Sequence, residues 1–407
     1  MNKEPVTLNV LLYDWMVDGF QKYLDKFNAK YPWITIKSIP SVGREDLKLI
    51  EWQERLQEKG QSADLAITYE YYHWIERGLL EDLTPYIKND ATINNADILE
   101  GNMETFKIGE QTYALPVFLD TYWFYVNTDL LKSLNLQMPS NDWTYDELVE
   151  LATKATDRSI HQYGLDTSPP ITWYVKSLIS IANGHADQMF FMNKDLTESV
   201  IDTPEVIADL QWLYDLVNKH QVLVSDRVND EILRTYSQSL FFEGKALLVV
   251  AEYPPDPIWK FNWDVLPMPR GTRKQATMHQ ITPMGILETS QYKEEAYNFI
   301  SFFYELETQK FLADEAKVTM VRHPELDHYY DEISHWKGKN VEAIKLSNTI
   351  GYLDPIIMDP VFHKQYFPLY HDSSWKINSG EISFSEITKE IDNWSIQKMK
   401  FNPKTSV

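Results

Sequence analysis

The fold of this chain is decided at residues 113–131, which read Tyr-Ala-Leu-Pro-Val-Phe-Leu-Asp-Thr-Tyr-Trp-Phe-Tyr-Val-Asn-Thr-Asp-Leu-Leu. A proline-anchored extended segment leads into the aromatic run 122–126, whose composition predicts a strand. The polar residues 127–129 break this strand and can cap a short helix. After a polar loop, Thr144 and Glu147 have the spacing of a capping box, which predicts the start of the next helix.

Strand and helix signals alternate upstream of this stretch. Apolar periodicity predicts strands at 6–13, 35–39 and 64–68 and helices at 18–31 and 44–59. This βαβαβ order is typical of a mainly parallel sheet with helices on its faces. Ligands of such sheets bind at the carboxyl ends of the strands. Here those ends carry Tyr13-Asp14-Trp15 and Tyr69-Glu70-Tyr71-Tyr72.

Downstream segments continue the mixture of strands and helices. The predicted elements are helices at 148–155, 173–183, 203–219, 294–303 and 308–312 and strands at 163–165 and 246–251. Gly184 is expected to stop one helix, and Thr203 and Pro204 to start another. The length of 407 residues predicts two domains. Because no repeat or Gly/Ser linker separates them, we expect two interleaved lobes with several chain crossings.

Composition argues against several classes of function. Lys and Arg together number 38 and Asp and Glu 60, which gives a net charge of −22 and disfavours binding to nucleic acid or to an anionic membrane surface. The absence of cysteine rules out disulfides, thiolate catalysis and Cys-ligated metal centres. No segment approaches the ~20 apolar residues of a membrane span. Catalytic and nucleotide-binding motifs are absent as well, so we expect no enzyme activity, no cofactor and no metal.

Five motifs, taken in order, resemble the bacterial extracellular solute-binding protein family, the carbohydrate-binding receptors of ABC importers. The resemblance runs from about residue 6 to residue 399. Its motifs are the stretch 113–148, the turn Leu83-Thr84-Pro85, the turn Phe241-Phe-Glu-Gly-Lys245 before a buried strand, the crossing Ile281-Thr-Pro-Met-Gly-Ile286, and the helix start Gly380-Glu-Ile-Ser-Phe-Ser-Glu386.

The resemblance implies an α/β fold of the type II periplasmic-binding-protein class. Each lobe would be a mainly parallel sheet flanked by helices, with residues 1–113 and 280–321 in the first lobe and 114–279 and 322–407 in the second. A sugar would bind in the cleft between the lobes and stabilise a hinge-closed form. The resemblance also implies permease subunits as partners, a monomer, and a cell-surface location with the signal peptide and a lipid-anchored cysteine removed.

Candidate ligand contacts are aromatic, acidic and small residues at strand ends and crossings. Aromatic rings pack on the C–H faces of sugars, and carboxylates accept their hydroxyl protons; here aromatic residues make up 14% of the chain. Asp120 is singled out because a charge in an apolar stretch needs a partner, an open cleft, or a turn to cap. The candidates at strand ends and in the outgoing crossing are Asp14, Trp15, Tyr69, Glu70, Tyr71, Asp120, Thr121, Tyr122, Glu252 and Tyr253. The resemblance adds Pro170, Trp173, Met284, Gly285, His363, Tyr366 and Phe367.

Packing offers the alternative explanation for most of these residues, since many aromatics belong to cores. Three other functions also stay open. An acidic, aromatic cleft suits a cationic ligand such as a polyamine, particularly if Glu70, Asp120 and Glu252 converge without a neutralising Lys or Arg. A carbohydrate-active enzyme would need two carboxylates facing each other, one of them with a raised pKa. A structural adhesin with the same fold would show no closure on a small ligand.

Overall fold

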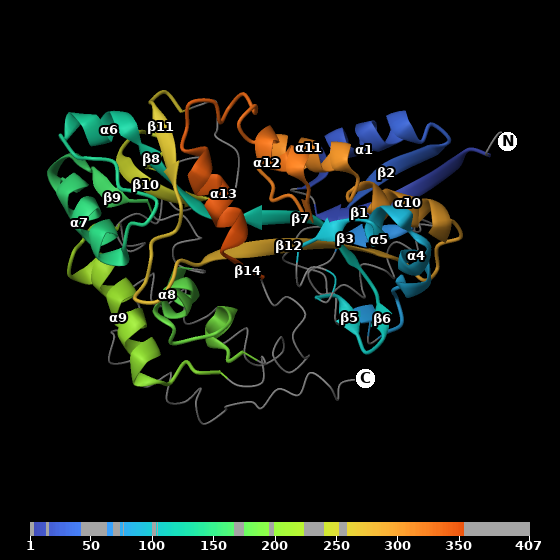
Figure 1. Ribbon diagram of the computed structural model, residues 1–407, viewed down its shortest axis with the longest axis horizontal. Coiled ribbons are helices and arrows are strands. Elements are labelled where there is room, and N and C mark those ends of the chain that lie inside the picture. The colour runs from blue at the N-terminus through green and yellow to red at the C-terminus, as the bar shows by residue number, and fades with distance from the viewer. Residues whose placement is uncertain are drawn as a thin grey trace.

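Two lobes lie side by side and are joined by long strands that cross between them (Figure 1). The computed structural model describes residues 4–13, 16–41, 63–67, 74–75, 77–99, 103, 105–166, 175–194, 199–223, 240–251 and 259–353. The predicted helix at 44–59 and the helix start at 380–386 lie outside these residues.

Among the described residues, the first sheet has six strands. They are β1 (Val6–Tyr13), β2 (Ile34–Ser41), β3 (Leu65–Ile67), β7 (Leu115–Thr121), β12 (Thr277–Ile286) and β14 (Gly351–Leu353). As the βαβαβ order predicts, β1 pairs in parallel with both β2 and β3. β12 is antiparallel to β3 and to β7. It contains Pro283 at a point where its register with β7 shifts, which is where a strand tolerates proline.

The second sheet is mixed, and this corrects the expectation of a mainly parallel sheet in each lobe. Its order is β11-β8-β10-β9, with β8 at Trp123–Asn127, β9 at Tyr163–Leu165, β10 at Ala246–Ala251 and β11 at Trp263–Leu266. Within the described part of the chain, β8 is antiparallel to β10 and β11, and β9 is parallel to β10. An apolar pattern predicts that a segment is a strand, but it does not specify that strand's neighbour.

Helices cover both sheets (Figure 1). In the described ranges, those longer than one turn are α1 (Val17–Lys30), α4 (Thr84–Asn89), α6 (Thr128–Ser133), α7 (Tyr145–Ala155), α8 (Lys176–Asn183), α9 (Pro204–Asn218), α10 (Lys293–Phe302), α11 (Leu306–Asp314), α12 (Pro324–Tyr329) and α13 (Val341–Thr349). Shorter elements are α5 (Ala91–Asn94), the 3₁₀ turns Arg158–Ile160 and Met189–Phe191, and the strand pairs β4 (Asp97–Ile98) with β13 (Val321–Arg322) and β5 (Lys107–Ile108) with β6 (Gln111–Thr112).

Hydrophobic cores define the two lobes. The first-lobe core takes its members from Leu8 to Leu119 and from Ile281 to Val321, except that Ala313 and Ala316 within this range pack in a core of the second lobe. The second lobe has two cores, one on each face of its sheet, because Phe124 and Val126 of β8 join one core while Trp123 and Tyr125 join the other. Core membership therefore changes between 119 and 122 on the outgoing crossing and between 278 and 281 on the return crossing.

Local sequence signals account for several helix boundaries. Thr144 accepts from the backbone N–H of Glu147, and the Glu147 carboxylate accepts from the Thr144 N–H, which completes the predicted capping box of α7. Asn127 caps α6, and Gly184, with φ of +80°, ends α8 as predicted. In α1 the buried residues Phe20, Tyr23, Leu24 and Phe27 follow helical spacing.

Candidate functional site

Strand direction brings the predicted site segments of the first lobe to one edge of its sheet. β12 begins beside the second-lobe core, which contains Met278, and ends in the first-lobe core, which contains Ile286. β3 is antiparallel to β12, and β1 and β2 run parallel to β3. All three strands therefore run toward the second lobe, where they end at Tyr13, Ser41 and Ile67.

The second sheet presents its strand ends in the opposite direction. β8 follows β7 along the chain and leads away from the first lobe, while β10 is antiparallel to it, with Ala251 opposite Trp123. β9 is parallel to β10. Both β9 and β10 therefore run back toward the first lobe and end at Leu165 and Ala251. Carboxyl ends from the two lobes thus face one another across the crossings.

Most predicted contact residues follow these strand ends in the sequence but are not themselves described. Asp14 and Trp15 come directly after β1, and Glu252 and Tyr253 come directly after β10. The predicted residues outside the described part of the chain are Asp14, Trp15, Tyr69, Glu70, Tyr71, Pro170, Trp173, Glu252, Tyr253, His363, Tyr366 and Phe367. For these residues, the structure shows only where the neighbouring strands lie and in which direction those strands run.

A polar face of the crossing strands carries the described candidates Asp120 and Tyr122. Asp120 is opposite Gln280 in the β7–β12 pair, so their side chains lie on the same face, and Tyr122 is two residues further along. The Tyr122 hydroxyl donates to Gln280 Oε1 at 2.9 Å. Lys317 forms an ion pair with Asp120 through Nζ and Oδ1. Asp120 therefore has a partner for its charge and caps no turn. We define Asp120, Tyr122, Gln280 and Lys317 as the crossing cluster.

Sequence reasoning missed two members of the crossing cluster. Gln280 is a polar residue inside an otherwise mostly apolar strand, and the reasoning that singled out Asp120 would also have found it. Lys317 gave no such signal because it follows α11 in an irregular segment, 197 positions from Asp120. Only the folded chain brings this ammonium group to the carboxylate.

Three other predicted contacts are buried in packing. Met284 has no exposed surface and belongs to the first-lobe core. At Gly285 a Cβ atom would lie 3.0 Å from Leu80 Cδ2 and from the Tyr113 carbonyl oxygen, so the glycine serves close packing within that lobe. Thr121 is fully buried on the face opposite to Asp120. Packing therefore explains Met284 and Gly285, whereas the buried Thr121 hydroxyl has no hydrogen-bond partner among the described residues. Because none of the three is open to a ligand, we leave them out of the proposed contact set.

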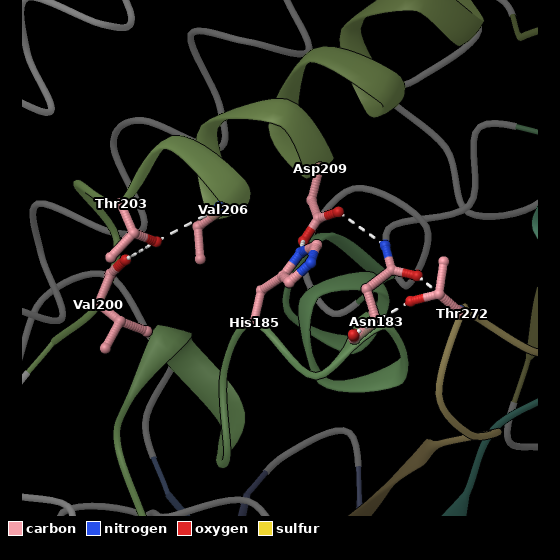
Figure 2. Close-up of polar contacts among 7 residues, drawn as sticks. All are labelled: Asn183, His185, Val200, Thr203, Val206, Asp209 and Thr272. Carbon is pink, nitrogen blue, oxygen red and sulfur yellow. Dashed lines mark hydrogen bonds and ion pairs between the residues drawn. The ribbon is translucent and has the colours of Figure 1, made fainter.

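A polar network around the buried Asp209 in the second lobe has a structural explanation (Figure 2). The Asp209 carboxylate in α9 accepts from Asn183 Nδ2 at 2.7 Å, and its other oxygen lies 2.8 Å from His185 Nδ1. Asn183 Oδ1 in turn accepts from the Thr272 N–H at 2.9 Å. Thr203 caps the start of α9, as predicted. The network ties the end of α8 to α9 and to the segment before β12, and it contains none of the predicted contacts.

Within the described ranges, no group of three or more His, Asp or Glu side chains is arranged to hold a metal ion. A surface groove between α7 and α9 is lined by Val149, Thr153, Trp212 and His220 together with the charged residues Asp146, Glu150 and Lys154. No predicted contact residue lines it. None of the described helices is both long enough and apolar enough to span a membrane.

Facing strand ends on two sheets joined by crossing strands define a two-lobed binding protein of the type II periplasmic class. The sequence profile of the bacterial extracellular solute-binding protein family matches residues 13–310. The chain belongs to this family, which confirms the resemblance. The family is one of solute-binding proteins rather than enzymes, and its members are extracellular.

Solved structures with the same fold include several sugar-binding proteins. The ABC substrate-binding protein Lmo0181 from Listeria monocytogenes, in complex with cycloalternan, has a TM-score of 0.78 and 22% identity over 97% of this chain and 99% of that one. Maltose-bound MalE3 of T. maritima has a TM-score of 0.71 and 19% identity over 96% and 98%. The cyclic α-maltosyl-1,6-maltose binding protein from Arthrobacter globiformis has a TM-score of 0.70 and 16% identity over 96% and 97%.

Proposed function

We propose that this chain captures a neutral oligosaccharide between its lobes and presents it to an ABC importer. Closure would occur about the crossings, at 119–122 and 278–281, where core membership changes. The closed form would be stabilised by ligand contacts from both lobes. The contact set that we propose combines Asp120 with the undescribed candidates from the strand ends, among which Trp15, Trp173 and Glu252 are the principal ones. Tyr122 is 2% exposed and belongs to a core of the second lobe, so we assign it the role of holding Gln280 beside Asp120.

The facing strand ends are the observation that carries this proposal. In open α/β sheets ligands bind beyond the carboxyl ends of the strands. Here such ends converge from both lobes, and aromatic and acidic residues follow them in the sequence. Aromatic faces with a few carboxylates are the groups that a sugar requires. Structural relatives in complex with cycloalternan, maltose and maltotetraose support an α-glucan oligosaccharide in particular.

A cationic ligand is the second candidate, and the crossing cluster weighs against it. A polyamine would be favoured by carboxylates that lack a neutralising partner. Asp120 already has Lys317 as its partner, so this carboxylate offers a protonated amine much less attraction. A neutral ligand with many hydroxyl groups suits the paired carboxylate better, because it gains hydrogen bonds without disrupting the ion pair.

Several further properties belong to the same proposal. The permease subunits of the importer would recognise the closed form, and the receptor would act as a monomer without nucleic acid. A lipid anchor at the cell surface would keep it near the permease. No covalent chemistry is needed for capture and release, so we propose a receptor without catalytic activity. Turnover of an aryl glycoside would contradict this part.

A thermal-shift screen tests the proposal. Maltose, maltotetraose and cycloalternan are compared with spermidine, putrescine and amino acids. A ligand at a hundred times its Kd adds about 2.7 kcal/mol to the free energy of unfolding, which raises the Tm visibly. We expect a shift with at least one saccharide and none with the polyamines.

Two substitutions then locate the site. Trp173→Ala and Glu252→Ala should each weaken saccharide binding by about tenfold or more, which corresponds to ~1.4 kcal/mol. Trp212→Ala, on the α7–α9 groove, is the matched control and should leave the Kd unchanged. Shifts with polyamines alone would replace the saccharide proposal with the cationic one. Equal effects of Trp173→Ala and Trp212→Ala would contradict the proposed cleft.

A further inference from the structure

We infer that Lys317 determines the charge selectivity of the cleft by neutralising and orienting Asp120. In this role it is a positioning residue, which acts on the ligand through the carboxylate that it holds. The inference rests on the proposed function and extends it from the class of ligand to the residue that excludes cations.

The contact between the two side chains is sheltered from solvent. Lys317 Nζ bonds Asp120 Oδ1, and the exposed fractions of the two side chains are 24% and 13%. The Lys317 ammonium also lies 5.8 Å from the centre of the Phe118 ring, on the face of β7 that it shares with Asp120. Charges in such a place are screened less than charges at the surface. Removing one partner therefore leaves an uncompensated charge that a ligand can satisfy.

The backbone fixes Lys317 from both sides. The Lys317 N–H donates to the Leu312 carbonyl at 3.0 Å, which closes the end of α11, and Ala316 between them has a φ of +58°. This is the left-handed conformation that ordinarily favours glycine. Val318 N–H then donates to the Leu119 carbonyl of β7 at 2.7 Å, and the Lys317 carbonyl accepts from the Tyr330 hydroxyl at 3.3 Å. The segment is thereby attached alongside the crossing strand.

Neighbouring charges leave Lys317 available to Asp120. Glu315, two residues earlier, has its own ion-pair partner in Lys22. Asp120 and Lys317 thus form a separate, locally neutral pair at the point where the chain crosses between the lobes. The anionic charge that would attract a polyamine is balanced from inside the protein, while the carboxylate oxygens can still accept hydroxyl protons from a sugar.

Binding measurements on single-charge variants test this inference. Wild type, Lys317→Met, Lys317→Gln and Lys317→Arg are titrated by calorimetry with maltotetraose, cycloalternan and spermidine. Lys317→Met keeps the length of the side chain and removes its charge. We expect it to weaken saccharide binding by about tenfold and to create spermidine binding that wild type lacks. Lys317→Arg should bind saccharides and spermidine with the same selectivity as wild type.

A matched control separates selectivity from general stability. Lys293 pairs with Glu81 at 2.6 Å in the first lobe, with exposed side-chain fractions of 25% and 23%, so Lys293→Met removes a comparable ion pair away from the crossing cluster. We expect this variant to bind both ligand classes as wild type does. Adding Asp120→Asn to Lys317→Met removes the freed carboxylate and should abolish spermidine binding. Lys317→Gln, which keeps a hydrogen-bond donor, replaces Lys317→Met if the latter does not fold.

The outcomes distinguish the two proposals. Suppose that wild type binds a saccharide, and that Lys317→Met and Lys317→Gln have the same affinities for saccharides and spermidine as Lys293→Met. The inference about Lys317 is then wrong, while the proposal of a saccharide receptor stands. If wild type binds neither saccharide, the proposed function fails and the inference fails with it. A gain of spermidine binding in both neutral variants, reversed by Asp120→Asn, would establish Lys317 as the selectivity residue.

Discussion

At the scale of single residues, the second lobe depends on close approaches that only glycine allows. A Cβ atom on Gly164 in β9 would lie 2.2 Å from the Ala152 carbonyl oxygen of α7. A Cβ atom on Gly271 would lie 2.4 Å from the Ala182 carbonyl carbon at the end of α8. Both obstacles are helix backbone, which cannot turn aside as a side chain can. The positions of α7 and α8 are therefore set in part by the absence of a methyl group.

Gly164→Ala tests this dependence. The substitution must move α7 or β9, so we expect the free energy of unfolding to fall by about 3 kcal/mol. Urea unfolding followed by circular dichroism measures the change. Gly19→Ala is the control, because a Cβ atom on Gly19 in α1 would have no neighbouring atom within 4 Å. There the better helix propensity of alanine should raise stability by up to ~1 kcal/mol. A loss of less than about 1 kcal/mol at Gly164 would contradict the argument.

Residue pairs also show what sequence alone can predict. Thr144 and Glu147 are three positions apart, so the spacing itself encodes their capping box, and the structure contains it. Asp120 can be recognised as a charge that needs an explanation, but its partner cannot, because Lys317 lies 197 positions away. The place of Thr121 and Met284 in a crossing predicts that both contact the ligand. The sequence does not reveal that their side chains pack inward.

At the scale of elements, β12 joins the lobes and carries a buried histidine. His279 is 5% exposed, and its Nε2 lies 3.3 Å from the Ser347 carbonyl oxygen at the end of α13. A Cβ atom on Gly351, the first residue of β14, would lie 2.0 Å from the same nitrogen. Burial lowers the pKa of His279 from 6.5 to about 4. The imidazole is therefore neutral where β12, β14 and α13 meet.

His279 should make the protein sensitive to acid. Its pKa is lower in the folded state than in the unfolded state, so below pH 6.5 the unfolded chain takes up the proton first. The contribution of His279 to stability should be constant above about pH 6.5 and should fall by about 3 kcal/mol toward pH 4. His279→Gln should remove that part of the loss, as measured by urea unfolding at about pH 7 and about pH 4.5. Identical profiles for His279→Gln and wild type would contradict this.

Elements are easier to predict than their pairing. The run at 122–126 and the apolar segment 246–251 both form strands of the second sheet. Their antiparallel alignment departs from the expected parallel order because β8 arrives directly from the crossing strand β7, whereas β10 returns toward it. Strand pairing depends on how the chain enters a lobe, and local periodicity contains no information on that path.

At the scale of the whole molecule, strand direction links fold to function. The strands β1, β2 and β3 of one lobe and β9 and β10 of the other end facing each other, while β7 and β12 cross between the lobes (Figure 1). A ligand that contacts both sets of strand ends stabilises whichever arrangement brings them together. Ligand binding and lobe movement are therefore expected to be two aspects of a single equilibrium.

Distance measurements between spin labels test this coupling. The chain contains no cysteine, so introduced thiols are labelled without background. Ile160 in the second lobe and Tyr292 in the first are 61% and 44% exposed, and Ile160→Cys with Tyr292→Cys reports on the distance between the lobes. We expect saturating maltotetraose to change this distance distribution. The pair Ser133→Cys and Ile160→Cys, both within the second lobe, should give the same distribution with and without sugar because each lobe moves as a unit about the crossings. An unchanged inter-lobe distribution despite calorimetric binding would mean that the saccharide binds without closure, and recognition by the importer would then need another signal.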